Sequence, residues 1–135
     1  MPWAAPAPLD PGPAGPPVAT AADEWSLDVT PTLLFRFSAL TYNAHRIHFD
    51  HPYATGVEGY PGLVVHGPLL ALLALELPRR HAPERRVAAF GYRLVRPSFA
   101  PARLAATGLV DGPTVTLAAG TEGAQPSLTA TATLE

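Results

Sequence analysis

The chain has 135 residues, the usual size of a single domain with one hydrophobic core. Only 15% of the residues are charged and 47% are apolar, which excludes a disordered polyelectrolyte over most of the length. The net charge of −2 makes a nucleic-acid partner unexpected, and the absence of cysteine excludes disulfides, zinc–thiolate sites and cysteine nucleophiles. The sequence shows neither a signal peptide nor an apolar run long enough to span a bilayer. We therefore expect a cytoplasmic location and no membrane partner.

The first 24 residues differ in composition from the rest of the chain. Residues 1–24 are rich in proline and alanine and carry no apolar periodicity. Proline removes backbone donors and fixes φ, so this composition predicts a disordered or polyproline tail. A docking tail that contains Trp3 is the alternative. We place the domain boundary here and expect one folded domain over residues 25–135.

The folded domain opens with alternating apolar residues, a pattern typical of strands. A first alternation begins at Trp25 and ends before Pro31. Beyond this proline, Leu33, Phe35 and Phe37 would share one face of an extended segment. The pattern therefore predicts a second strand from about residue 32 to residue 39.

The middle of the chain combines a polar loop with a very apolar helix. Residues 41–62 are rich in histidine and broken by proline and glycine, which predicts a short helix or two within a long irregular stretch. A helix should begin at Pro68, because proline is favoured at the start of helices. Pro78 and the pair Arg79–Arg80 should mark its end, where cations complement the helix dipole. The helix is apolar on nearly every side and must be enclosed.

The last third of the sequence predicts strands separated by turn residues. The expected strands are residues 87–96, 102–110, 114–119 and 127–134. Their hairpin-length connections favour an antiparallel sheet curved around one helix, which is an α+β architecture. Such a sheet has edge strands, and dimerisation is one way to cover them.

Histidines are concentrated just before the predicted helix. His45, His48 and His51 lie within seven residues, and His66 directly precedes the helix. A metal site is one interpretation, although no carboxylate and second histidine stand at a familiar metal-binding spacing. Ordinary surface or capping histidines are the second interpretation. Acid–base catalysis is the third, because a neutral imidazole suits proton transfer near pH 7.

The residue that opens the helix offers a partner for the third interpretation. Gly67 would lie at the helix N-terminus, where a backbone N–H has no acceptor within the helix and the dipole adds positive charge. A carbonyl placed there would be polarised, and glycine lets a ligand approach the backbone closely. A plain junction between a loop and a helix is the alternative.

Two segments together resemble a known family. The sequences TYNAHRIHFDHPYA and EGYPGLVVHGPLL are similar to the signature of MaoC-like acyl-thioester hydratases and dehydratases, which have the hot-dog fold. The similarity is strongest to the branch with mesaconyl-coenzyme A hydratases and 3-hydroxyacyl-thioester dehydratases. It covers residues 30–80 well and the later strands loosely. The resemblance implies a single hot-dog unit, with an antiparallel sheet wrapped around one central helix.

The family motif is Asp-x-Asn-Pro-x-His-x-Asp, and this chain departs from it. Asn43 takes the place of the first Asp, His45 that of the Asn, and Arg46 that of the Pro. By resemblance, His48 handles the reacting water or a proton, Asp50 is the trailing Asp, and the glycine after His66 provides the oxyanion N–H. An amide cannot take up a proton, so Asn43 would hold a water molecule while the histidine titrates.

The resemblance implies a lyase that hydrates 2,3-enoyl thioesters or dehydrates 3-hydroxyacyl thioesters reversibly. The implied hydration requires no metal or redox cofactor, and coenzyme A or phosphopantetheine enters only as part of the substrate. Two alternatives remain: a non-catalytic hot-dog subunit that binds acyl thioesters within a heteromer, and a thioesterase. Fatty-acid or polyketide metabolism is the expected setting, and we expect a dimer.

Four further residues are expected to contact the substrate. Arg93 and Arg96 would reach the phosphates of coenzyme A or of a carrier protein's phosphopantetheine, or else be solvated charges at a strand end. Tyr60 would line the substrate tunnel or anchor its loop. His66 is expected at the same site because it precedes the helix. The expected partners are an acyl-coenzyme A or acyl-carrier-protein substrate and a second hot-dog unit, as a homodimer or a heteromer.

Overall fold

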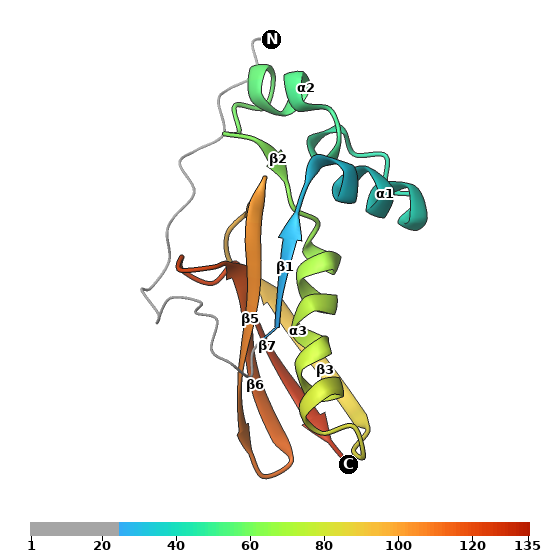
Figure 1. Ribbon diagram of the computed structural model, residues 1–135, viewed down its shortest axis with the longest axis vertical. Helices are drawn as coiled ribbons and strands as arrows, with labels where there is room; N and C mark the ends of the chain where they lie inside the picture. Colours follow the sequence, from blue (N-terminus) through green and yellow to red (C-terminus); the bar gives the residue numbers. More distant parts are fainter. Residues whose placement is uncertain (1–24) are drawn as a thin grey trace.

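The computed structural model of the protein describes residues 25–135. In chain order the elements are β1 (Trp25–Val29), α1 (Pro31–Thr41), the 3-10 helix η1 (Arg46–His48), α2 (His51–Gly56), β2 (Leu63–Val64), α3 (Gly67–His81), β3 (Val87–Leu94), β4 (Phe99–Ala100), β5 (Ala102–Asp111), β6 (Thr114–Thr121) and β7 (Leu128–Leu134). Figure 1 shows α3 running along the sheet, with α1, α2 and β2 gathered at the end where α3 begins. The predicted tail, residues 1–24, lies outside the described residues.

Five strands form one antiparallel sheet in the order β1-β5-β6-β7-β3. The four strands predicted for the last third of the chain are confirmed as β3, β5, β6 and β7. A second, two-stranded sheet pairs β2 with β4, where Leu63 lies opposite Ala100 and Val64 lies opposite Phe99. This small sheet was not predicted, because two-residue strands carry no periodicity in the sequence.

Helix α3 packs on the five-stranded sheet and provides much of the core. Its buried residues are Leu69, Leu70, Ala71, Leu73, Ala74, Leu77 and Pro78. They meet the inward face of the sheet, where β7 alternates buried and exposed side chains along its whole length. The predicted α+β architecture with one central helix is therefore confirmed. The predicted end at Pro78 and the pair Arg79–Arg80 agrees with the structure to within one residue: α3 ends at His81, with both arginines in its last turn and Pro78 inside the helix.

The prediction of a strand over residues 32–39 is wrong, because this segment is helix α1. Thr30 caps the helix by accepting a hydrogen bond of 3.1 Å from the Leu33 N–H. Pro31 then occupies the first helical position, which suits its fixed φ and missing donor. The proline therefore starts a helix here, whereas the sequence analysis took it to interrupt one strand and precede another.

Burial along α1 follows the helical period and not the alternation of a strand. Leu34 and Ser38, four residues apart, are buried, while Leu33 and Phe37 are half-buried beside them. Phe35, which a strand would have placed with Leu33 and Phe37, is 61% exposed. The i, i+4 pattern was present in the sequence, but the alternating aromatic residues hid it.

The polar stretch between α1 and α3 contains η1 and α2, as the prediction of a short helix or two requires. Tyr42 ends α1 in a left-handed conformation with φ of 54°.

Across residues 25–135, every helix is too short or too polar to cross a bilayer.

Candidate active site

His48 lies in the short helix η1 and is 8% exposed. Its Nδ1 lies 2.7 Å from the carbonyl oxygen of Val64 in β2. A carbonyl only accepts hydrogen bonds, so Nδ1 carries the proton and donates it. The lone pair is therefore on Nε2, which makes this nitrogen the one that can act as a base.

His66 lies directly against His48, although 17 residues separate them. The two rings stack with centroids 3.8 Å apart and an angle of 17° between their planes. His66 is 1% exposed, and its Nε2 lies 2.7 Å from the Ser38 hydroxyl of α1. Its other nitrogen, Nδ1, is buried and has no hydrogen-bond partner within residues 25–135. Phe37 packs on the same ring with a centroid distance of 4.8 Å.

Both stacked rings are neutral at pH 7. Burial lowers the pKa of His48 from its ordinary value of 6.5, and the nearby His45 ring lowers it further, whereas the hydrogen bond to Val64 raises it. Burial lowers the pKa of His66 to about 4, with a smaller contribution from repulsion by His48. A neutral His48 is the form that accepts a proton.

The low pKa of His66 makes the stability of the fold depend on pH. In the unfolded chain the ring titrates near 6.5, whereas in the folded protein it titrates near 4, so between these values the unfolded state binds more protons. We expect the free energy of unfolding to decrease as the pH falls from about 7 to about 4.5, by ~2 kcal/mol for this ring. Urea unfolding at both pH values measures the decrease. The variant His66→Gln has no titrating ring at this position, so the contribution of His66 to the decrease in the free energy of unfolding should be absent. An equal decrease in the variant and the parent would contradict the lowered pKa of His66.

Gly67 opens α3 beside these histidines. It occupies the first helical position, so its N–H has no acceptor within the helix. The His66 carbonyl accepts the N–H groups of Leu69 and Leu70, the first hydrogen bonds of the helix. A Cβ added at Gly67 would lie 2.5 Å from Leu94 Cδ1 in β3. The side chain of Leu94 therefore lies directly against Gly67.

Asn43 lies just after α1, two residues before His45. Its Oδ1 accepts the His45 N–H at 3.0 Å, and its own N–H donates to the Ser38 carbonyl at 2.9 Å. Across the described residues, no hydrogen bond joins Asn43 directly to His48. The His45 ring meets the His48 ring edge-on, with centroids 5.7 Å apart. The structure thus places Asn43 near the site but occupies part of its acceptor capacity.

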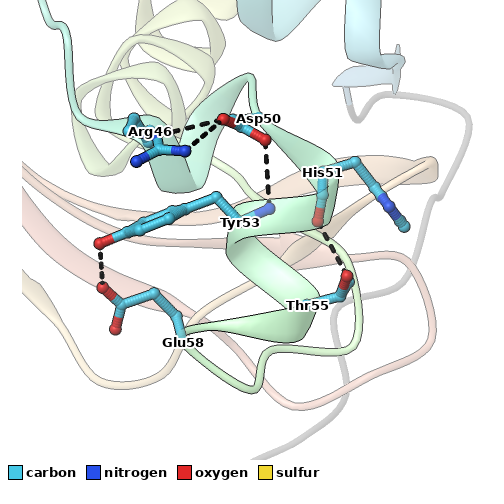
Figure 2. A network of polar contacts seen from close by, with 6 residues as sticks. All are labelled: Arg46, Asp50, His51, Tyr53, Thr55 and Glu58. Carbon is cyan, nitrogen blue, oxygen red and sulfur yellow. Dashed lines mark hydrogen bonds and ion pairs between the residues drawn. The ribbon is translucent and has the colours of Figure 1, made fainter. Parts of the chain in front are cut away.

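Polar contacts around α2 fix the segment that carries His48 (Figure 2). Asp50 caps α2 by accepting the Tyr53 N–H at 3.1 Å, and it pairs with Arg46 at 2.9 Å. These two contacts lower the pKa of Asp50 from its ordinary value. The Tyr53 hydroxyl donates to Glu58 at 2.7 Å. Through these contacts Asp50 fixes the course of the backbone two residues after His48.

The structure does not bring every predicted residue to this site. Tyr60 packs on Phe99 with a centroid distance of 5.9 Å, and its N–H donates to the Ala54 carbonyl, as a loop anchor would. Arg93 is paired in register with the exposed Thr129, so it lies on the sheet face opposite α3.

Arg96 is half-buried after β3, and its backbone N–H approaches the Ser127 carbonyl at 3.4 Å. His51 is exposed, and Figure 2 shows its ring pointing away from Arg46 and Asp50. No three His, Cys, Asp or Glu side chains gather as metal ligands anywhere in residues 25–135.

Ser38 is the site residue that the sequence analysis missed. It is buried in α1 and 28 residues from His66 in sequence, so no motif links the two. The available signal was helical periodicity, which would have placed Ser38 on the buried face with Leu34.

Solved structures place the architecture in a known class. An (R)-hydratase from A. caviae superposes with a TM-score of 0.70 at 23% identity, over 87% of this chain and 95% of that one. A chain of the ChsH1-ChsH2 complex from Mycobacterium tuberculosis superposes with a TM-score of 0.68 at 20% identity, over 87% and 96%. The fold is therefore the hot-dog fold, as the resemblance implied.

The family follows from the sequence. The model of the hydroxyacyl-thioester dehydratase type 2 family matches residues 6–100, and the chain belongs to this family. Mesaconyl-C(4)-CoA hydratase of Chloroflexus aurantiacus is 62% identical over 78 residues, which is 56% of this chain and 28% of that protein. The predicted resemblance is confirmed, and the chain spans little more than a quarter of that relative. The family match begins inside the segment predicted as a tail.

Proposed function

We propose that the protein is a lyase that adds water reversibly across the 2,3-double bond of an enoyl thioester. The observation that carries the proposal is the buried His48, with its Nε2 lone pair available, stacked on the ring of His66, which directly precedes Gly67 and its unpaired N–H at the start of α3. A base and an oxyanion donor at one site are what this reaction needs. Membership of the hydroxyacyl-thioester dehydratase family supports the same chemistry.

In the proposed reaction, one water molecule supplies both the hydroxyl on the β-carbon and the proton on the α-carbon, so that all atoms are accounted for. The Gly67 N–H binds the thioester carbonyl oxygen, which makes the β-carbon electrophilic. His48 Nε2 takes a proton from water as the water oxygen bonds to the β-carbon, and the resulting enolate is held at Gly67. The same proton then passes from Nε2 to the α-carbon, which gives the 3-hydroxyacyl thioester. Asn43 would orient the water by hydrogen bonding.

We also propose the substrate and partner classes. Hydration involves neither oxidation nor reduction, so His48, Gly67 and Asn43 are sufficient for the proposed reaction. Coenzyme A or phosphopantetheine enters only as part of the substrate. A second hot-dog unit is the proposed partner. β3 lies at the edge of the sheet, and its end exposes Tyr92, Leu94 and Val95. The cytoplasm stays the predicted compartment.

The function is tested by adding crotonyl-coenzyme A and a panel of enoyl and 3-hydroxyacyl thioesters to the purified protein. Loss of the enoyl-thioester absorption band, with formation of the 3-hydroxy product, is the expected result. Release of free thiol without hydration would identify a thioesterase, and binding without turnover would identify a scaffolding subunit. Light scattering on the same preparation tests the partner proposal, which an active monomer would contradict.

A further inference from the structure

We propose that His66 and Ser38 are positioning residues, which hold the imidazole of His48 in one plane and keep water from one of its faces. The proposal rests on the proposed function, because positioning matters only where His48 transfers a proton. Neither residue has a task in the hydration step described above. Both are nevertheless buried polar groups, with exposed fractions of 1% for His66 and 5% for Ser38.

The stack is the first observation. With centroids 3.8 Å apart and planes 17° from parallel, the His66 ring covers one face of the His48 ring. The Val64 carbonyl fixes the Nδ1 edge at 2.7 Å. A ring fixed along one edge can still tilt about that hydrogen bond, and a parallel ring on one face prevents this tilt. The two contacts together aim Nε2.

The hydrogen bond between Ser38 and His66 is the second observation. At 2.7 Å it joins α1 to the residue that caps α3, across 28 residues of sequence. The bond occupies His66 Nε2 and leaves Nδ1 buried without a partner among the described residues. An unpaired buried nitrogen costs free energy. A less polar residue would avoid this cost, so the retained imidazole is consistent with a role in positioning.

Charges around the stack contribute less to the low pKa of His48 than burial does. Within residues 25–135, the rings that contact His48 are those of His66 and His45. On the flanking segment Arg46 and Asp50 pair with each other. The remaining titratable groups on the neighbouring elements are the exposed Arg36 of α1 and four groups of α2 and its following loop, namely His51, Tyr53, Glu58 and Tyr60; β2 carries none. Exclusion of water is the largest cause of the low pKa of His48, and the stacked His66 provides part of that exclusion.

Three variants separate positioning from general stability. Ser38→Ala keeps both rings but removes the hydrogen bond, and His66→Gln keeps an amide near the position of Nε2 but removes the stack. Ser127→Ala is the matched control, because Ser127 is 2% exposed and likewise has one side-chain hydrogen bond, of 2.6 Å to Ser98. The rate is measured from about pH 5 to about pH 9, and the His48 ring is titrated by NMR in the same proteins.

Both site variants should lower kcat about tenfold with little change in KM, since the base is present but poorly aimed. Water then reaches His48, so the acid limb of the pH profile and the NMR titration should move upward by about one pH unit. Ser38→Thr, which keeps the hydroxyl, should restore the parent profile. Ser127→Ala should leave it unchanged.

The NMR titration distinguishes the two proposals. An upward shift in Ser38→Ala and His66→Gln, in a protein that hydrates no thioester, would leave the contact between the rings established and overturn the proposed function. Unchanged titration and an unchanged pH profile in both variants would overturn the positioning role. An equal shift in Ser127→Ala would also overturn it, because the effect would then follow any lost buried hydroxyl.

Discussion

Replacing His48 by alanine is expected to lower hydratase turnover by about a hundredfold or more, the contribution typical of a general acid–base group. The imidazole is the titrating group whose tautomer leaves the Nε2 lone pair free, and it stacks on His66, the residue before Gly67. The loss should appear in kcat at every pH, because no neighbouring group replaces the base. The enoyl-thioester absorbance assay measures it.

The matched control for this variant is His51→Ala. His51 lies three residues further along the same segment, and it is exposed. Its replacement should leave turnover within about twofold of the parent, as is usual for exposed residues. Thermal unfolding of both variants shows whether the fold is retained. Near-native hydration by a folded His48→Ala protein would contradict the assignment and direct attention to His45 and His66.

Replacing Gly67 by proline should lower kcat by about a hundredfold or more, since proline removes the one backbone donor proposed to hold the enolate oxygen. Proline is tolerated at the first position of a helix, where no helical hydrogen bond is lost. His66 has ψ of 132°, which is the conformation that a following proline requires. Position 67 itself precedes Pro68, which restricts any residue with a Cβ there, so the retention of the fold is checked against a variant that shares this restriction.

Gly67→Ala is the control, because it adds a Cβ in the same place but keeps the N–H. In both variants this atom meets Leu94 Cδ1, the end of a flexible side chain that is 51% exposed and can move aside. Alanine should cost far less activity than proline. Equal losses in the two variants would show that crowding, and not the missing donor, lowers the rate. Circular dichroism confirms that α3 is intact in both.

Local signals explain why part of the site could be predicted. Pro68 and the apolar run after it located the start of α3, and hence Gly67 at the first helical position. The same rule applied to Pro31 would have predicted α1, but the alternating Leu33, Phe35 and Phe37 favoured a strand. Both periods fitted the same few residues, and only the tertiary packing of Leu34 distinguishes them.

Other parts of the site depend on contacts that no spacing encodes. The bond between Ser38 and His66 needs α1 to be folded against the start of α3. The place of Arg93 depends on which face of β3 it occupies, and most of that strand is exposed, so its sequence shows no clear inward side. The sequence could therefore suggest His48 and Gly67 as the groups that we propose to react, but not the residues that hold them or the faces that they occupy.

The bond from His48 to Val64 makes one part of the site resistant to mutation. The acceptor is a backbone carbonyl, which every amino acid possesses, so no single substitution at position 64 deletes it. The carbonyl is held in place by the pairing of Val64 with Phe99 between β2 and β4. The side chain at position 64 can therefore change while His48 keeps the same tautomer. Insertions or deletions between η1 and α3 would displace the carbonyl, so along this segment natural selection should act on loop length more strictly than on the identity of residue 64.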